Sequence, residues 1–175
     1  MQIKTIFLDR DGVINEEVNY LFKISEFEFI DGIFDALTNF QKLNYQIIII
    51  TNQSGIARKY YKEKDYQILT KWMLGQFQEQ GIKILDIFHC PHDPNAGCDC
   101  RKPKPGMIEK AKDIYDIDIN NSWMIGDKEV DISAANAGGI ENTILVRSGH
   151  LIDERNSKAK FFLDSIKQAK EIIIK

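Results

Sequence analysis

Short apolar runs that alternate with helical patterns are the feature that most limits how this chain can fold. Strands are predicted at five apolar runs, at residues 3–8, 45–50, 84–89, 123–125 and 143–146. The first two runs are apolar enough to be buried on both faces, as the central strands of a parallel sheet are. Helical patterns separate the runs, at residues 32–43, 63–80, 105–115 and 129–137. This order predicts an α/β fold in which helices cover a parallel sheet.

The remaining sequence fits one cytoplasmic domain. A chain of 175 residues can bury roughly two thirds of its unfolded surface, so we expect residues 1–175 to form a single domain. A closing strand is predicted near residue 161 and a final helix over 163–174. The longest apolar run, 47–50, is too short to cross a bilayer, and residues 1–4 lack the layout of a signal peptide. We therefore expect a cytoplasmic protein.

Polar motifs follow three of the predicted strands. They are Asp9-Arg10-Asp11-Gly12, Thr51-Asn52-Gln53-Ser54-Gly55 and Gly126-Asp127-Lys128-Glu129-Val130-Asp131. Each motif by itself would also suit a polar turn or a helix cap. In a parallel sheet, however, the carboxyl ends of the strands share one edge, and ligands bind beyond that edge. The coincidence of the motifs therefore favours one shared site over three separate turns.

The residue types in these motifs suit a phosphate ester and a divalent cation. Asp9 and Asp11 are two residues apart, and like charges this close repel unless a cation neutralises them. The hydroxyl of Thr51 and the N–H groups that follow it can donate to phosphate oxygens. Asp127 and Asp131 would complete an oxygen site for a hard divalent cation.

Together with Lys102, these motifs resemble those of the haloacid-dehalogenase-like (HAD) phosphotransferase superfamily. The matching residues are Asp9-x-Asp11-Gly12, Thr51-Asn52, Lys102 and Gly126-Asp127-x-x-x-Asp131. The resemblance runs from Ile3 to about Val146 and implies a three-layer Rossmann-like fold with a central parallel sheet. No stretch is long enough for a separate cap domain, since the gap 12–31 holds only a flap and the gap 52–84 only one helix.

The resemblance implies a role for each motif residue. Asp9 is the nucleophile that forms an aspartyl-phosphate, and Asp11 is the acid and base that serves the leaving group and the water. Thr51 and Lys102 would donate to the phosphoryl oxygens. An Asp at position 11 is typical of the phosphatases of this superfamily and not of its dehalogenases.

The resemblance also implies a magnesium site. Its ligands would be Asp9, the backbone carbonyl of Asp11 and Asp127, with Asp131 supporting them from outside. Mg²⁺ would cancel the repulsion between an anionic nucleophile and an anionic substrate.

All three cysteines lie in the segment 90–100, which we interpret as a zinc loop. Cys90, His92, Cys98 and Cys100 make a Cys₃His set, and four protein ligands leave no position for water, so the zinc should be structural. The alternative is free thiols or an occasional disulfide, although a disulfide is uncommon in the cytosol. We interpret His89 and His150 as non-ligands. Zinc would hold Arg101 and Lys102 toward the phosphate site.

The zinc loop makes the chain similar to the capless histidinol-phosphate/heptose-bisphosphate phosphatase group. Ser54 and Lys128 favour the heptose branch, since the histidinol branch typically has Asp and Arg at these positions. The five-residue span between His92 and Cys98 is short, as in the histidinol branch. Loop length varies at low cost on a surface, whereas residues that face the ligand constrain specificity, so we favour the heptose branch.

The heptose branch implies removal of the C7 phosphate of D-glycero-D-manno-heptose 1,7-bisphosphate, in ADP- or GDP-heptose precursor biosynthesis. The second phosphate of such a substrate calls for extra positive charge, which Arg101, Lys128 and Arg58 offer. The predicted substrate-binding residues are Glu17, Val18, Asn19 and Tyr20 of the flap, with Asn52, Gln53, Ser54, Arg101 and Lys128. Histidinol phosphate, the alternative, has a cationic amine and would need an acidic wall, for which Glu17 is the candidate.

Other classes of function fit less well. A binding module on an inactive scaffold would lack a motif residue, and none is missing. A net charge of −3 offers no general attraction to nucleic acid or membranes, and no aromatic residue lies between 90 and 106 for bases to stack on. In a signalling domain with Asp9 as a stable phosphosite, Asp11 would make the phosphate short-lived. We expect a small phosphorylated sugar as the partner, and a monomer.

Overall fold

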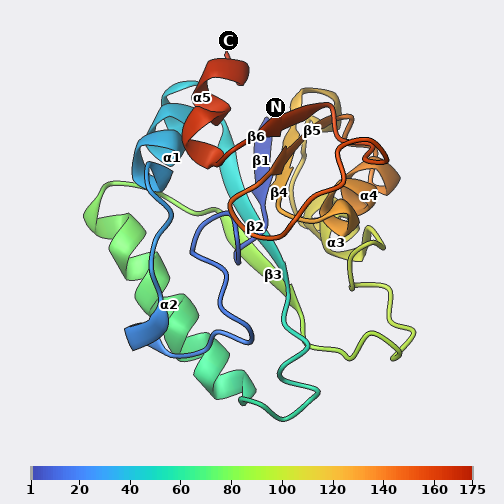
Figure 1. Ribbon diagram of the computed structural model, residues 1–175. Coiled ribbons are helices and arrows are strands. Elements are labelled where there is room, and N and C mark those ends of the chain that lie inside the picture. The colour runs from blue at the N-terminus through green and yellow to red at the C-terminus, as the bar shows by residue number, and fades with distance from the viewer. Residues whose placement is uncertain (1, 175) are drawn as a thin grey trace.

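Six parallel strands form one sheet in the computed structural model, which describes residues 2–174 (Figure 1). The strands are β1 (Thr5–Leu8), β2 (Gln46–Asn52), β3 (Asp86–Cys90), β4 (Trp123–Gly126), β5 (Asn142–Val146) and β6 (Phe161–Leu163). Their order in the sheet is β3-β2-β1-β4-β5-β6, and every neighbouring pair is parallel. The first strand in the chain therefore lies inside the sheet, between β2 and β4.

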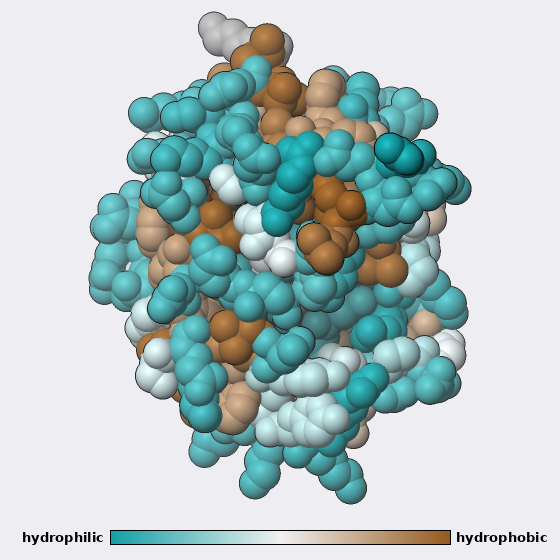
Figure 2. All heavy atoms as spheres, in the orientation of Figure 1, coloured by the Kyte–Doolittle hydropathy of each residue, from teal (hydrophilic) through white to brown (hydrophobic). Residues whose placement is uncertain are grey.

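Helices cover both faces of the sheet, which gives three layers (Figure 1). One hydrophobic cluster contains α1 (Ile33–Lys42), α2 (Glu63–Glu79) and α5 (Ala169–Ile172), and the other contains α3 (Gly106–Ile114) and α4 (Glu129–Ala137). Short 3₁₀ turns lie at residues 24–26, 119–121 and 166–168. The face drawn in Figure 2 is mostly hydrophilic, with hydrophobic side chains in small separate patches.

Strand β2 shows why the chain carries four consecutive isoleucines. Ile47 and Ile49 belong to the cluster on the α1 side, Ile48 and Ile50 belong to the cluster on the α3 side, and all four are fully buried. Successive strand residues point to opposite faces, so a strand with helices on both sides needs an apolar residue at every position. The prediction that this strand is buried on both faces is confirmed.

The predicted elements agree with the structure except at the end of the chain. The predicted strands and internal helices are confirmed, with ends that differ by one or two residues, and the strand near residue 161 is β6. The prediction of one helix over 163–174 is wrong. Leu163 pairs with Val146 in the sheet, and the chain then forms a 3₁₀ turn and the short α5. The side chain of Ser165 accepts a backbone N–H at the start of this turn, which separates it from the strand.

Loops from five neighbouring strands meet at one edge of the sheet, because all the strands run the same way. The first two motifs follow β1 and β2, the cysteine segment follows β3, and the Gly126 motif ends β4. Residues 147–150 follow β5 at the same edge. A site at this edge draws on residues that are far apart in the sequence.

Removing a buried side chain from β2 should destabilise the fold. We expect Ile49→Ala to lower the free energy of unfolding by about 2–5 kcal/mol, because it leaves a cavity between the sheet and the helices on that face. Urea unfolding measures the change. The control is Ile68→Ala, at a side chain of α2 that is 50% exposed, and it should change the value by less than about 0.5 kcal/mol. Similar losses in both variants would contradict this account of the core.

Candidate active site

A cavity of about 350 Å³ opens at the edge of the sheet where the motifs lie. It is lined by most of the predicted site residues, namely Asp9, Asp11, Glu17, Val18, Asn19, Tyr20, Asn52, Gln53, Ser54, Arg101, Lys102, Lys128 and Asp131. Thr51 and Asp127 are not in the lining. Both are almost fully buried behind it, where Thr51 contacts Gln53 and Asp127 contacts His150. The structure thus brings all the predicted residues except the cysteine cluster to one place.

The ammonium of Lys102 is buried between two carboxylates. Its Nζ lies 2.9 Å from Asp9 Oδ1 and 2.7 Å from Asp131 Oδ1, and it donates to the carbonyl of Ile50 at 2.8 Å. Burial alone would lower the pKa of Lys102, but the charges of Asp131 and Asp9 outweigh it and raise that pKa. Lys102 therefore stays charged although it is only 3% exposed.

Asp131 joins this cation to the loop that carries Asp127. Its Oδ2 accepts the backbone N–H groups of Asp127 and Lys128, at 3.1 and 3.0 Å, and so caps the first turn of α4. Gly126 leaves room for this contact, since a side chain there would overlap the carboxyl group of Asp131. Both oxygens of Asp131 are thus already paired, which suits a supporting position better than direct ligation of a metal.

Asp9 and Asp127 form a buried acidic pair that needs a cation. No described residue offers a hydrogen bond to Oδ1 of Asp127. Burial, with the nearby carboxylates of Asp9 and Asp131, raises the pKa of Asp127 to about 9. Burial also raises the pKa of Asp9 to about 6, against the opposing charge of Lys102. One oxygen from each of Asp9, Asp127 and Asp131 lies within 4.8 Å of the others, and this oxygen set fits a hard divalent cation.

His150 is a site residue that sequence reasoning missed. Its Nδ1 lies 2.5 Å from Asp127 Oδ2, and its Nε2 lies 4.0 Å from Glu17 Oε1. It follows β5, and the hydroxyl of Ser148 ties this segment to the first motif by donating to the carbonyl of Gly12 at 2.7 Å. His150 has no motif spacing that marks it. Its place after a strand that ends at the same sheet edge is the signal that could have found it.

Asp11 is held by donors that the motif analysis did not single out. Arg10 Nη2 and Asn15 Nδ2 donate to its Oδ1, at 2.8 and 3.1 Å, and Gln53 Nε2 donates to its Oδ2 at 3.1 Å. Arg10 is only 2% exposed, although a charged residue between two aspartates would be expected in solvent. The pairing with Asp11 is what allows this guanidinium to be buried.

The flap closes one side of the cavity through aromatic contacts. Tyr20 meets Tyr60 edge to face at 4.5 Å between ring centres, and Phe22 stacks on Tyr61 at 5.4 Å. Both partners belong to the loop that follows β2. The predicted flap residues 17–20 line the cavity, so this short segment forms part of its wall.

Arg58, Arg101 and Lys128 are three further cations on the cavity lining. Arg101 and Lys128 have no carboxylate partner among residues 2–174, and Arg101 Nη1 is buried without a hydrogen bond from them. Arg58 lies 3.6 Å from Asp93 of the cysteine segment. Unpaired cations in a cavity favour an anionic ligand.

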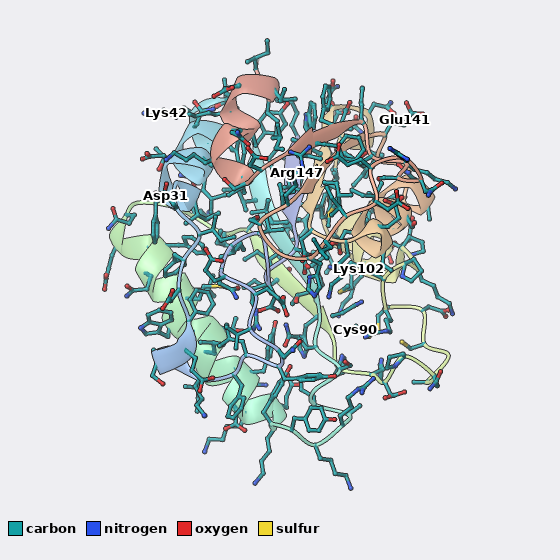
Figure 3. The ribbon with its side chains drawn as sticks, viewed as in Figure 1. Asp31, Lys42, Cys90, Lys102, Glu141 and Arg147 are labelled. Carbon is teal, nitrogen blue, oxygen red and sulfur yellow. The ribbon has the colours of Figure 1, made fainter. Side chains whose placement is uncertain are left out.

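The four predicted zinc ligands come together after β3. The Sγ atoms of Cys90 and Cys98 are 3.7 Å apart, and His92 Nδ1 lies 3.2 Å from Cys100 Sγ. Ligands at ~2.3 Å on a tetrahedron would be separated by ~3.8 Å, so these side chains fit zinc. All three cysteines are free thiols, and His89 lies apart, paired with Glu63. Figure 3 shows Cys90 and Lys102 at the same end of the sheet.

The chain is similar to known proteins over nearly its whole length. It is 52% identical, over 90% of both chains, to D-glycero-alpha-D-manno-heptose-1,7-bisphosphate 7-phosphatase of Photorhabdus laumondii. It is 42% identical to D-glycero-beta-D-manno-heptose-1,7-bisphosphate 7-phosphatase of Vibrio cholerae, over 97% of this chain and 96% of the relative. The chain belongs to the heptose-bisphosphate phosphatase family.

A family model and a solved structure agree with this membership. Residues 99–169 match a model described as HAD-hydrolase-like. A crystal structure of D,D-heptose 1,7-bisphosphate phosphatase from B. bronchiseptica, complexed with magnesium and phosphate, has a TM-score of 0.85 and 28% identity over 97% of both chains. The HAD fold predicted from the motifs is therefore confirmed for this member of the heptose-bisphosphate phosphatase family.

Loss of Asp131 should destabilise the protein, because it leaves Lys102 buried with one carboxylate fewer and uncaps α4. We expect Asp131→Ala to lower the free energy of unfolding by about 3 kcal/mol, measured by urea unfolding. Glu154→Ala is the control, since it breaks an exposed pair with Arg147 and should cost less than about 1 kcal/mol. If both variants lowered the free energy of unfolding by less than about 1 kcal/mol, the buried pair of Lys102 and Asp131 would not stabilise the site.

Proposed function

We propose that this chain is a magnesium-dependent phosphatase that removes the C7 phosphate of D-glycero-D-manno-heptose 1,7-bisphosphate. The observation that carries the proposal is the buried cluster at the sheet edge, where Lys102 lies between Asp9 and Asp131 and Asp127 has an unpaired oxygen. Membership of the family supports it, and so do the magnesium and phosphate in the B. bronchiseptica structure.

Asp9 and Asp11 have different roles in the proposed reaction. The Asp9 carboxylate attacks the phosphorus, the bond from phosphorus to the sugar oxygen breaks, and an aspartyl-phosphate forms. Asp11 gives its proton to the departing oxygen and then takes one from the water that hydrolyses the aspartyl-phosphate. Lys102 holds Asp9 in place, and its positive charge stabilises the negative charge that gathers on the phosphoryl oxygens. Thr51 accepts from Gln53, so its own hydroxyl proton is free to donate as well.

Asp9, the backbone carbonyl of Asp11 and Asp127 would hold Mg²⁺. When bound, the ion offsets the repulsion between the carboxylate nucleophile and the phosphate. Asp131 fixes the backbone of the loop that carries Asp127, and through it the position of that ligand.

Arg101, Lys128 and Arg58 would bind the phosphate that stays on the sugar. These three cations on the cavity lining suit the second phosphate of a bisphosphate. Histidinol phosphate is the competing substrate, and Glu17 on the cavity wall is the acidic group that its amine would need. Burial and the nearby charge of Asp11 raise the pKa of Glu17, however, and this lessens its negative charge toward a ligand.

The α anomer is the proposed form of the substrate. The relative named for the α anomer is 52% identical to this chain, and the relative named for the β anomer is 42% identical. This assignment rests on overall similarity alone.

Zinc at Cys90, His92, Cys98 and Cys100 is proposed as a structural ion. The segment that it would fix is tied to the loop after β2, because Gln53 donates its backbone N–H to the carbonyl of Cys90 at 2.7 Å. It also leads directly into Arg101 and Lys102. Zinc would therefore hold one wall of the cavity in place.

We infer a single phosphatase domain over 1–175, a monomer and a cytoplasmic location. None of the helices within residues 2–174 is long and apolar enough to cross a membrane.

The substrate proposal is tested by phosphate release with Mg²⁺. We expect the α anomer of heptose 1,7-bisphosphate to be cleaved in preference to the β anomer and to histidinol phosphate. Asp9→Asn and Asp11→Asn should each abolish release while the circular dichroism spectrum stays unchanged, because each removes a group that reacts. Asp35→Asn, the same change at an exposed site on α1, should keep full activity. A preference for histidinol phosphate would overturn the substrate, and a fully active Asp9→Asn would overturn the mechanism.

The zinc proposal is tested by metal analysis. We expect one zinc ion per purified chain, and Cys98→Ala should lose it and melt at a lower temperature, because the loop loses its cross-link. His89→Asn is the matched control and should keep the zinc, since His89 pairs with Glu63 instead. Zinc removal should lower activity even with Mg²⁺ present. A zinc-free chain with full activity would contradict the link between this loop and the cavity wall.

A further inference from the structure

The side-chain amide of Gln53 is fully occupied by other residues of the site. Its Nε2 donates to Asp11 Oδ2 at 3.1 Å and to Thr51 Oγ1 at 2.8 Å, and its Oε1 accepts from the Tyr61 hydroxyl at 2.5 Å. Gln53 and Tyr61 are both buried. Gln53 is therefore a fixed link between Tyr61 and two residues of the proposed reaction.

The chemistry of the partners determines which way this amide points. The Asp11 oxygen that faces Gln53 accepts a hydrogen bond both in the carboxylate and in an acid that carries its proton on the other oxygen, so the NH₂ group of Gln53 faces it. The Oε1 atom then faces Tyr61, whose hydroxyl must donate. Burial raises the pKa of the Tyr61 hydroxyl, which keeps the proton that this hydrogen bond uses. Without that donor, the buried Oε1 would be unpaired, and the amide would lose the contact that fixes its orientation.

The ring of Tyr61 is itself held on two sides. Phe22 of the flap stacks on it, with the ring planes 16° apart. Gly55 approaches it so closely that a side chain at position 55 would overlap the ring. The hydroxyl of Tyr61 therefore has little freedom to move away from Gln53.

We propose that Tyr61 is a positioning residue that orients Asp11 through Gln53. The inference rests on the proposed function, in which Asp11 is the general acid. Arg10 and Asn15 hold Oδ1 of Asp11, and Oδ2 accepts from Gln53 at 3.1 Å and from Arg10 Nε at 3.2 Å, so Gln53 supplies one of the two contacts that fix Oδ2. Removing the Tyr61 hydroxyl loosens the contact to Oδ2, and the direction in which Asp11 presents its proton is then less well defined.

The effect of a misplaced Asp11 depends on the leaving group. A sugar alkoxide is strongly basic, so it needs the Asp11 proton as its bond to phosphorus breaks and the bond from Asp9 forms. The 4-nitrophenolate ion is a weak base and leaves without that proton. Damage to the fold, to the metal site or to Asp9 would slow both esters, whereas a misplaced acid slows mainly the sugar ester.

The experiment compares kcat/KM on these two esters, because kcat/KM reports the steps up to the first phosphoryl transfer. For Tyr61→Phe with Mg²⁺, we expect kcat/KM on heptose 1,7-bisphosphate to fall about tenfold, and kcat/KM on 4-nitrophenyl phosphate to stay within about twofold of the wild type. Equal losses on both esters, or no loss on either, would overturn the proposal. Tyr115→Phe is the matched control. It removes a hydroxyl that donates to Asp86 at 2.9 Å, away from the cavity, and should leave both values unchanged.

A second variant tests whether Tyr61 acts through Gln53, and it also covers the case in which Tyr61→Phe folds poorly. Gln53→Ala should lower kcat/KM on the sugar ester at least as far as Tyr61→Phe does, and on 4-nitrophenyl phosphate by less, because it breaks the contacts to both Asp11 and Thr51. Adding Tyr61→Phe to Gln53→Ala should change kcat/KM by less than about twofold, because the link is already broken. Losses that multiply in the double variant would overturn the proposed route.

Failure of the substrate proposal can be told apart from failure of this inference. If the wild type does not cleave heptose 1,7-bisphosphate but does cleave glycerol 3-phosphate, the assigned sugar is wrong. Glycerol 3-phosphate then replaces the heptose as the alkyl ester. For Tyr61→Phe, kcat/KM on glycerol 3-phosphate should fall about tenfold while kcat/KM on 4-nitrophenyl phosphate stays within about twofold, and equal losses or no loss would overturn the proposal.

Discussion

The buried ammonium of Lys102 is the group on which the arrangement of this site depends. It joins the end of β1 through Asp9, the start of α4 through Asp131, and the main chain of β2 through the carbonyl of Ile50. These segments are distant in the sequence and meet because the strands are parallel. Asp9 and Asp131 contact this one cation and Asp127 lies beside them, so three buried carboxylates share one ammonium, and such an oxygen-rich acidic cluster suits a magnesium ion. The cations that suit an anionic substrate, Arg58, Arg101 and Lys128, line the same cavity.

Much of the site could be predicted because polar residues interrupt very apolar surroundings. Asp9, Thr51 and Asp127 stand where buried strands end, and the parallel order of those strands implies that the ends meet. Arg10 could not be found in this way, and His150 could be found only by treating the loop after β5 as part of the same sheet edge. Arg10 is buried by its pairing with a neighbouring aspartate, and His150 enters through a loop with no spacing to the other motifs. Such contacts depend on side-chain packing in three dimensions, which residue periodicity does not contain.

The secondary structure of the C-terminal segment could not be predicted from the sequence either. Residues 161–174 are apolar at intervals that suit either a strand or a helix, and the chain uses both in turn. Phe161–Leu163 form a sixth strand because they pair with the free edge of β5. The short helix after it packs on the α1 side of the sheet. Local propensity alone does not distinguish these outcomes.

The position of β1 inside the sheet bears on how the protein is made on the ribosome. The chain emerges from its N-terminus, yet β1 needs β4, which is synthesised more than a hundred residues later, to cover its second edge. Until then, a nascent chain exposes that edge of a strongly apolar strand to other chains. His150 comes later still. Translation must therefore be almost complete before the nucleophile has its full surroundings, and chaperones have a long interval in which to act on the unfinished sheet.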